Sequence, residues 1–288
     1  MNFPAYLRLT RAPGAFTVIS NITAAHVVAV SAAPQWVPLL LTIMVSLGLY
    51  HSGMVINDIV DIETDRQERP ERPLVSGIIT IASARRFAAL LMIGAIALSV
   101  MIGPAPLIIS LVLAGLILFY NLVAKQGPLG PLVMAACRYT NWMLGLSVVT
   151  LSPDLALIAL PLPAYVYGLT LLSRQETSLG TVPSVRVSMV LLVLAGGLVL
   201  FNATVTGAGY GVLSGFVILM VATLLLRLAQ LAQRASPERV QGMVTVLIMG
   251  LIPLDALIVF SQGAMIEAVL ILLLILPASR VARYIYVT

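Results

Sequence analysis

The chain has 288 residues, of which 60% are hydrophobic and only 9% are charged, and its mean hydropathy is +1.06. This composition excludes a soluble enzyme, because the apolar runs repeatedly reach the length that a bilayer requires. The net charge of +5 is carried by scattered loop arginines, so it indicates contact with anionic lipid head groups and no nucleic-acid partner. Cys137 is the single cysteine, which excludes an intramolecular disulfide.

Apolar stretches follow one another along the whole chain and predict an integral membrane protein with nine or ten spans. We expect an all-α, polytopic helical bundle with one domain over residues 1–288. Ten candidate spans are 16–33, 36–56, 87–102, 105–122, 132–151, 155–172, 187–206, 211–228, 244–260 and 264–277.

The basic residues predict the orientation of these spans, because cytoplasmic loops are enriched in lysine and arginine. With a cytoplasmic N-terminus, every basic residue except Arg138 falls on the cytoplasmic side, and Arg138 lies inside a predicted helix. A nine-span arrangement would leave Arg280 and Arg283 outside, so ten spans are preferred. We therefore expect a plasma-membrane protein whose long polar loops face the cytoplasm.

Two long polar segments, 57–86 and 173–186, follow the second and the sixth predicted span. Their equivalent positions suggest two four-helix halves built on one plan around a central cavity, with the polar loops as a cytoplasmic cap. Chemistry is expected on that side, because the opposite loops are short and nearly uncharged.

A cluster of acids comes directly after the second span. Continued as a helix at about 100° per residue, Asp58, Asp61 and Asp65 fall on one face, and Glu63 points to the far side. Three carboxylates on one face predict a site for a hard divalent cation, Mg²⁺.

Arginines follow these acids at once. Arg69 and Arg72 could bind the phosphate oxygens of a magnesium-bound diphosphate, because guanidinium groups make paired hydrogen bonds to phosphate. The alternative interpretation is a charged loop whose acids and arginines pair with each other.

This pattern resembles a known family. The segment Asn57-Asp58-x-x-Asp61-x-x-x-Asp65, followed by Arg69-x-x-Arg72-Pro73-Leu74, is similar to the first aspartate-rich motif of the UbiA superfamily of intramembrane prenyltransferases. Further similar features are Arg8-x-x-Arg11-x-Pro13, the segment from Tyr120-Asn121 to Lys125, and Arg138-x-x-Asn141-x-x-x-Gly145.

The resemblance implies a helical bundle in which Mg²⁺ holds a prenyl diphosphate and the prenyl group passes to an aromatic or other lipophilic acceptor in the membrane. It also implies a bacterial inner-membrane location and contact with membrane lipids. The residues expected to bind metal and to act in catalysis are Asp58, Asp61, Asp65 and Glu176. Those expected to bind the diphosphate are Asn57, Arg69, Arg72, Lys125, Arg138 and Arg174.

The second polar loop departs from the family pattern. Where the family carries another pair of aspartates, this chain has Ser173-Arg174-Gln175-Glu176-Thr177, a variation that resembles UbiA-like members of bacterial ebo-type gene clusters. Two alternatives to prenyl transfer therefore stay open. One is a protein that binds an isoprenoid diphosphate or related lipid for biosynthesis or export without turning it over. The other is a secondary transporter.

Polar residues inside predicted spans complete the set of candidates. Asp255 lies in mid-span, where an ionisable residue is costly and often functional, although a hydrogen bond between helices would explain it too. The residues expected to contact the acceptor or to line the cavity are Asn21, His26, Tyr139, Asn141 and Asp255.

Overall fold

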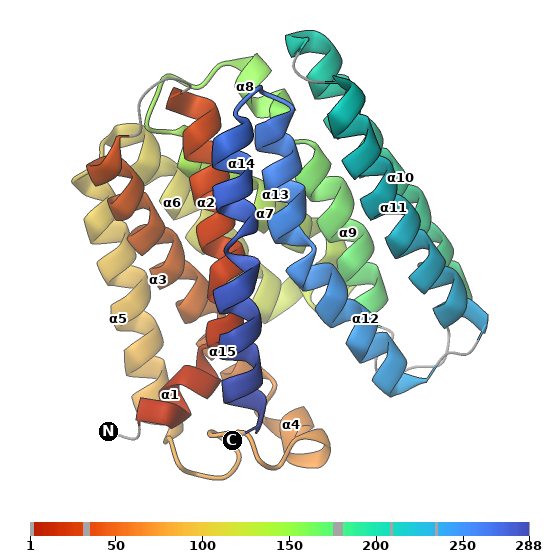
Figure 1. Ribbon diagram of the computed structural model, residues 1–288. Coiled ribbons are helices and arrows are strands. Elements are labelled where there is room, and N and C mark those ends of the chain that lie inside the picture. Colours follow the sequence, from red (N-terminus) through yellow and green to blue (C-terminus); the bar gives the residue numbers. More distant parts are fainter. Residues whose placement is uncertain (1–2, 31–34, 175–180, 208–209, 234–235, 288) are drawn as a thin grey trace.

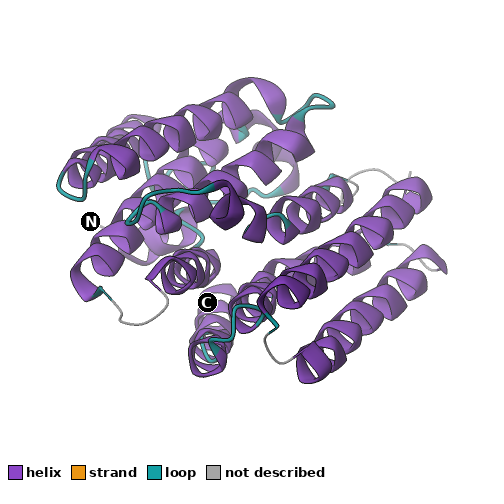
Figure 2. Ribbon diagram, turned by 90° about the horizontal axis from the view of Figure 1, so that it is seen from above, coloured by secondary structure: helices purple, strands orange, loops and turns teal. Residues whose placement is uncertain are grey.

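The computed structural model describes residues 3–30, 35–174, 181–207, 210–233 and 236–287, and all regular secondary structure in those ranges is helical (Figure 2). The helices are α1 (Phe3–Leu9), η1 (Ala12–Gly14), α2 (Ala15–Val30), α3 (Trp36–Val60), α4 (Ile62–Glu68), α5 (Ile81–Val100), α6 (Pro104–Phe119), η2 (Tyr120–Ala124), α7 (Gly130–Leu146), α8 (Pro153–Ile158), α9 (Pro161–Ser173), α10 (Thr181–Thr206), α11 (Tyr210–Gln233), α12 (Pro237–Met249), α13 (Leu251–Phe260), α14 (Met265–Leu272) and α15 (Ile275–Val287).

Within the described ranges, nine helical segments are long and apolar enough to cross a membrane, counting η1 with α2, α6 with η2, α8 with α9, α12 with α13, and α14 with α15 as single segments. Helix α7 is a tenth helix in the bundle, with 17 residues and the charged Arg138. Helix α1 and the far end of α15 lie at the same end of the molecule (Figure 1), as an even number of crossings requires. The all-α membrane bundle predicted from the sequence is confirmed.

Two apolar cores share α2 and α7. One core joins these helices to α3, α5 and α6, and the other joins them to the helices from α9 to α15. Consistent with this division, α3 and α5 lie on one side of the molecule and α10 and α11 on the other (Figure 1).

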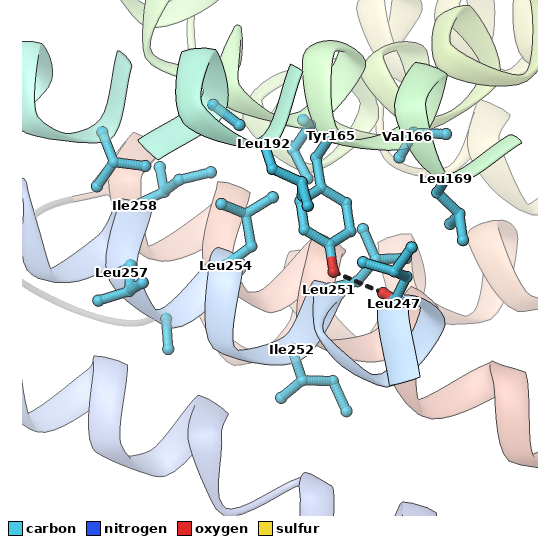
Figure 3. Close-up of a cluster of buried hydrophobic side chains, with 14 of the residues drawn as sticks. Tyr165, Val166, Leu169, Leu192, Leu247, Leu251, Ile252, Leu254, Leu257 and Ile258 are labelled. Carbon is cyan, nitrogen blue, oxygen red and sulfur yellow. Dashed lines mark hydrogen bonds between the residues drawn. The ribbon is translucent and has the colours of Figure 1, made fainter. Parts of the chain in front are cut away.

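The larger core is organised around Tyr165 of α9, which is fully buried. Its hydroxyl group donates a hydrogen bond to the carbonyl oxygen of Leu247 at 2.8 Å (Figure 3). The approach depends on Gly250, which joins α12 to α13, because a Cβ atom there would lie 2.3 Å from the Tyr165 oxygen. This contact fixes the angle at which α13 returns toward α2.

A third, smaller core lies beneath the polar segment that follows α4. Leu74 and Ile79 of that segment are buried together with Leu9 of α1 and Val55 of α3. Backbone hydrogen bonds from Ser76 N to Arg72 O and from Ile79 N to Pro73 O close the turns between them. The polar segment is therefore an ordered cap over one end of the bundle, and this order positions the site.

Candidate functional site: an acid and base cluster at the mouth of a cavity

The aspartate motif spans the junction of α3 and α4. Backbone hydrogen bonds continue through it, from Asp61 N to Asn57 O at 3.0 Å and from Asp65 N to Asp61 O at 2.8 Å. The sequence prediction of a continued helical face is therefore correct. Glu63 points away, is exposed, and forms an ion pair with Arg66 at 2.8 Å.

Asp58 and Asp65 share one guanidinium group. Arg72 Nη1 donates to Asp58 Oδ1 at 3.1 Å and to Asp65 Oδ2 at 2.5 Å. A second arginine, Arg11, reaches the same Asp58 oxygen at 3.0 Å from a position just before η1. The two carboxylates are only 5% and 3% exposed, so these pairs are shielded from solvent. Arg11 has a left-handed backbone conformation with φ of 49°, which is uncommon for a side chain of this size.

Asp61 belongs to a second group. Its Oδ2 accepts hydrogen bonds from Lys125 Nζ and from Asn57 Nδ2, and Lys125 also donates to Asn57 Oδ1 at 2.8 Å. Lys125 directly follows η2, a π-helical turn. It is 68 residues from Asn57 in the sequence, but the two side chains are in direct contact. Six charged side chains from four parts of the sequence thus meet at one end of the bundle.

These acids face basic side chains rather than one another. In the part of the chain that the structure describes, no three His, Cys, Asp or Glu side chains form a group that could hold a metal ion together. The contacts match the alternative interpretation, in which acids and arginines pair. The pairing is not confined to a solvated loop, however, because Arg11 and Lys125 come from distant helices.

The cluster nevertheless fits a divalent cation. Asp58 and Asp65 already converge on one positively charged nitrogen, and their oxygens are the ligand type that Mg²⁺ prefers. Burial raises the pKa of the Asp65 carboxyl above its ordinary value, the neighbouring Arg72 opposes that rise, and the nearby Asp58 and Asp61 add to it. Carboxylates so close together need positive charge between them, which an arginine or a metal ion can supply.

A cavity of about 200 Å³ opens beside the cluster. One face of α3 forms its wall, with Ser46, Tyr50, Gly53 and Asn57 at helical spacing. Met54 of α3 also lines it, and the other lining residues come from α2, α6, η2, α7 and the segment before η1: Arg11, Val18, Leu113, Ile117, Tyr120, Asn121, Met134, Cys137, Arg138 and Asn141. The cavity therefore combines an apolar wall, suited to a hydrocarbon, with polar groups at defined points.

The second polar loop reaches the same end of the bundle. Arg174 Nη2 donates to the backbone oxygen of Gln126 at 3.0 Å, next to Lys125, so this predicted residue lies beside the cluster. Glu176 falls outside the described residues. Arg69 directly follows α4, and its backbone N–H donates to Asp65 O at 2.8 Å.

The predicted acceptor residues divide into three groups. Asn141 lines the cavity, as does the predicted diphosphate ligand Arg138, which donates to Thr17 Oγ1 at 3.0 Å. Asn21 and Asp255 lie behind the cavity wall and connect to it through Asn141.

Tyr139 and His26 are placed elsewhere. The Tyr139 hydroxyl donates to Ala156 O at 3.2 Å, and neither residue is among those lining the 200 Å³ cavity. His26 is fully buried, and neither of its ring nitrogens has a hydrogen-bond partner among the described residues.

Sequence reasoning missed Arg11, Ser46 and Asn121 as site residues. For Ser46 the signal was present, because it lies on the same helical face as Asn57, three turns earlier. Arg11 and Asn121 stood inside segments already compared with the family, but nothing in their spacing showed which of those residues reach the cavity.

A larger cavity, of about 600 Å³, lies between α11 and the helices from α12 to α15. Its lining carries no charged side chain and only two threonines, Thr223 and Thr245. Such a lining suits hydrocarbon and cannot hold a diphosphate, so the smaller cavity is the candidate site.

Comparisons with known proteins match most of the chain to one family. The model of the UbiA prenyltransferase family matches residues 18–249. Digeranylgeranylglyceryl phosphate synthase of Methanoculleus marisnigri is 34% identical over 146 residues, 50% of this chain and 52% of that protein. The synthase of Saccharolobus solfataricus is 32% identical over 171 residues, 52% of this chain and 58% of that protein. The matched stretches thus span little more than half of these relatives.

Solved structures share the fold over nearly the whole chain. A digeranylgeranylglyceryl phosphate synthase structure has a TM-score of 0.69 at 23% identity, covering 91% of this chain and 98% of that one. A UbiA homologue from Archaeoglobus fulgidus, bound to GPP and Mg²⁺, has a TM-score of 0.66 at 15% identity, covering 91% and 99%. Together with the family match over most of its length, this likeness shows that the chain belongs to the UbiA prenyltransferase family.

Proposed function

We propose that this protein transfers a prenyl group from an isoprenoid diphosphate to a lipophilic acceptor within the membrane, with Mg²⁺ as cofactor and with its site at the cytoplasmic face. The observation that carries the proposal is the cluster of Asp58, Asp61 and Asp65 with Arg11, Arg72 and Lys125 at the mouth of a largely apolar cavity, in which Asp58 and Asp65 are buried. The relatives named above are prenyl-lipid synthases, and the Archaeoglobus homologue binds GPP and Mg²⁺, which supports the same chemistry here.

The charged residues suit the difficult step of this reaction. An allylic diphosphate ionises only when the charge developing on the leaving diphosphate is stabilised. Asp58, Asp61 and Asp65 would hold Mg²⁺. The ion would neutralise negative charge on the phosphate oxygens and make diphosphate a better leaving group. Arg72 and Lys125 lie beside these acids and would contact the remaining phosphate oxygens.

The cavity suits the other half of the substrate. Val18, Leu113 and Ile117 supply apolar contacts, and their lack of nucleophilic groups protects a carbocation from unwanted capture. At about 200 Å³ the cavity is smaller than common ligand pockets of roughly 300–1,000 Å³. A long prenyl chain would therefore extend from it toward the bilayer.

The relatives suggest an acceptor class different from the aromatic one expected at first. Their name, digeranylgeranylglyceryl phosphate synthase, refers to a glyceryl phosphate lipid. Arg138 lines the cavity and could bind an anionic head group. We therefore propose a lipid acceptor and do not restrict it to aromatic compounds.

The test is turnover by the purified protein. With Mg²⁺, prenyl diphosphates of several chain lengths and a panel of lipid and aromatic acceptors, we expect release of diphosphate and formation of a prenylated lipid. EDTA and Asp61→Asn should each abolish both. The matched control is Glu63→Gln, which changes an exposed acid of the same segment that forms an ion pair with Arg66, and it should keep full activity.

A second candidate function is binding without transfer. It is favoured by the single acid, Glu176, in the loop where the family has a pair of aspartates. This function predicts that a prenyl diphosphate binds in the presence of Mg²⁺ while no diphosphate is released with any acceptor. Failure to bind at all would overturn both functions.

A further inference from the structure

A chain of hydrogen-bonded side chains leads from α13 to the wall of the cavity. It starts at Asp255, which is fully buried. Asp255 Oδ1 accepts from Asn21 Nδ2 at 3.2 Å and from Trp142 Nε1 at 3.1 Å, and its Oδ2 accepts from Ser20 Oγ at 2.6 Å. Two further links reach the cavity: Asn141 Nδ2 donates to Asn21 Oδ1 at 2.7 Å, and Ser46 Oγ donates to Asn141 Oδ1 at 2.5 Å.

Chemistry fixes the direction of every link. The indole N–H of Trp142 can only donate, so Asp255 Oδ1 is an acceptor whether or not a proton sits on the other carboxyl oxygen. Asn21 therefore turns its NH₂ group toward Asp255 and its oxygen toward Asn141. Asn141 in turn presents its own oxygen to Ser46.

These directions determine what Ser46, which lines the cavity, can offer to a ligand. Its hydroxyl proton is donated to Asn141 Oδ1, so Ser46 Oγ can act only as a hydrogen-bond acceptor toward the cavity. None of the described residues donates a hydrogen bond to that oxygen. Because the proton cannot turn toward the cavity without breaking the chain, Ser46 offers only lone pairs to a ligand.

A second acceptor lines the same cavity. Asn121 donates through Nδ2 to the backbone oxygen of Ile117 at 2.9 Å, which fixes the orientation of its amide. Its Oδ1 is buried and has no partner among the residues that the structure describes. A buried acceptor without a partner is costly, so this atom too is placed to accept a hydrogen bond from a ligand.

The prenyl diphosphate cannot supply that donor. Its hydrocarbon chain has no polar hydrogen, and its ionised phosphate oxygens accept but do not donate. The ligand that fits is the acceptor substrate, provided that it carries a hydroxyl group. The position agrees with this role, since Ser46 lies eleven residues before Asn57 on one face of α3, or about 16 Å along the axis. The diphosphate and the reacting carbon would occupy the space between.

We infer that the acceptor substrate is an alcohol whose nucleophilic hydroxyl group donates a hydrogen bond to Ser46 Oγ, and that Asp255 is a positioning residue that keeps Ser46 an acceptor through Asn21 and Asn141. This inference rests on the proposed prenyl transfer. In that transfer the bond between the allylic carbon and the diphosphate oxygen breaks, and the acceptor oxygen bonds to the carbon. The hydroxyl proton leaves to the released diphosphate, and Ser46 neither gains nor loses one.

The test is steady-state kinetics of the full chain with each substrate varied in turn. Ser46→Ala and Asp255→Leu should each raise the KM for the alcohol acceptor about fivefold to tenfold, the effect of losing or misdirecting one hydrogen bond. The affinity for the Mg²⁺ complex of a prenyl thiodiphosphate should not change. Asp255→Asn should restore the wild-type acceptor KM, because its amide oxygen can occupy the Oδ1 position.

The matched control is Ser188→Ala. Ser188 is as buried as Ser46 and donates to Gly168 O at 2.7 Å, but it has no link to the cavity. The KM of the Ser188→Ala variant for the alcohol acceptor should therefore equal the wild-type value. An unchanged acceptor KM in Ser46→Ala would overturn the inference and leave the proposed function intact, as would a product prenylated on carbon. Absence of any turnover in the wild-type protein would overturn both.

Discussion

Arg72 shows how much of the site depends on a single side chain. Its Nη1 atom bridges Asp58 and Asp65 at 3.1 Å and 2.5 Å, and its side chain is 15% exposed. A lysine would carry the same charge but has neither the planar fork nor the same pattern of donors. Arginine can therefore bridge the two acids through Nη1 alone and offer its other N–H groups to a phosphate, which lysine cannot do.

We expect Arg72→Lys to lower kcat/KM for the prenyl diphosphate about tenfold or more, because paired hydrogen bonds to carboxylate and phosphate are lost. Steady-state kinetics on the purified protein measures this. Arg66→Lys is the control, since Arg66 pairs with Glu63 at an exposed position and exposed pairs contribute little. Equal activity of the two variants would show that the bridge has no role.

The sequence predicted these charged residues better than it predicted their contacts. Helical spacing separated Glu63 from the three aspartates correctly, because the backbone hydrogen bonds continue through Asp61. It did not predict that Asp61 pairs with Lys125 while Asp58 and Asp65 share Arg72. Those partners depend on how distant helices pack, which local periodicity does not encode.

At the scale of the elements, η2 leads directly to the site residue Lys125. A π-helical turn contains one more residue than an α-helical turn, and such turns are frequent at functional sites. Here it separates α6 from Lys125 and sets the direction of that side chain toward Asn57. Its outer residues, Leu122 and Val123, are 63% and 66% exposed, as expected for a surface that faces lipid.

Deleting Val123 should convert η2 into an α-helical turn. Lys125 would then rotate by about 100° around the helix axis and lose its contact with Asp61. We expect turnover to fall at least tenfold while circular dichroism shows an unchanged helix content. Val123→Ala, which keeps the length of the turn, should retain activity, and an active deletion variant would contradict this role for η2.

The crossing of α2 and α7 depends on a small residue. A Cβ atom at Gly145 would lie 2.5 Å from Ala25 Cβ and 3.0 Å from Ile22 O, so no side chain fits there without moving the helices. These two helices carry Asn21, Asn141 and Arg138, and their separation therefore sets the width of the polar wall.

Gly145→Ala should lower the free energy of unfolding by about 1–3 kcal/mol, the usual effect of overpacking. Equilibrium unfolding in detergent measures the change. In Gly94→Ala, the added methyl group meets no atom within 4 Å, so this variant should unfold like the wild type. If both variants were equally stable, the helix crossing would not be limited by Gly145.

Helix positions were predictable because apolar runs and loop residues mark them directly. The expected spans 36–56 and 105–122 correspond to α3 and to α6 with η2. The last element was underestimated, since the expected span 264–277 continues as α14 and α15 to Val287. Arginines in its final turns hid that continuation, because hydropathy falls where a helix leaves the membrane.

At the scale of the whole molecule, the bundle has two unlike ends. Helices α1 and α4 lie at one end and α8 lies at the other (Figure 1). The acid and base cluster belongs to the first end, so membrane orientation determines which compartment supplies Mg²⁺ and the diphosphate.

Cysteine accessibility tests that orientation. In a Cys137→Ala background, which removes the only native thiol, we expect Ser76→Cys to be protected from a membrane-impermeant thiol reagent in intact cells and Asp154→Cys to be labelled. Both positions are surface-accessible, near α4 and in α8 respectively. Labelling of Ser76→Cys alone would place the site on the outer face and contradict the proposed orientation.

The charge balance of the cluster has a consequence for how ligands bind. The carboxylates of Asp58, Asp61 and Asp65 are offset by Arg11, Arg72 and Lys125, so the charges of the cluster balance without a metal ion. Mg²⁺ alone would bring excess positive charge to this neutral cluster, and a diphosphate alone would bring excess negative charge. Each ligand should therefore bind weakly by itself and strengthen the binding of the other by the same factor. The site would then be occupied only when both Mg²⁺ and the prenyl diphosphate are present at sufficient concentration.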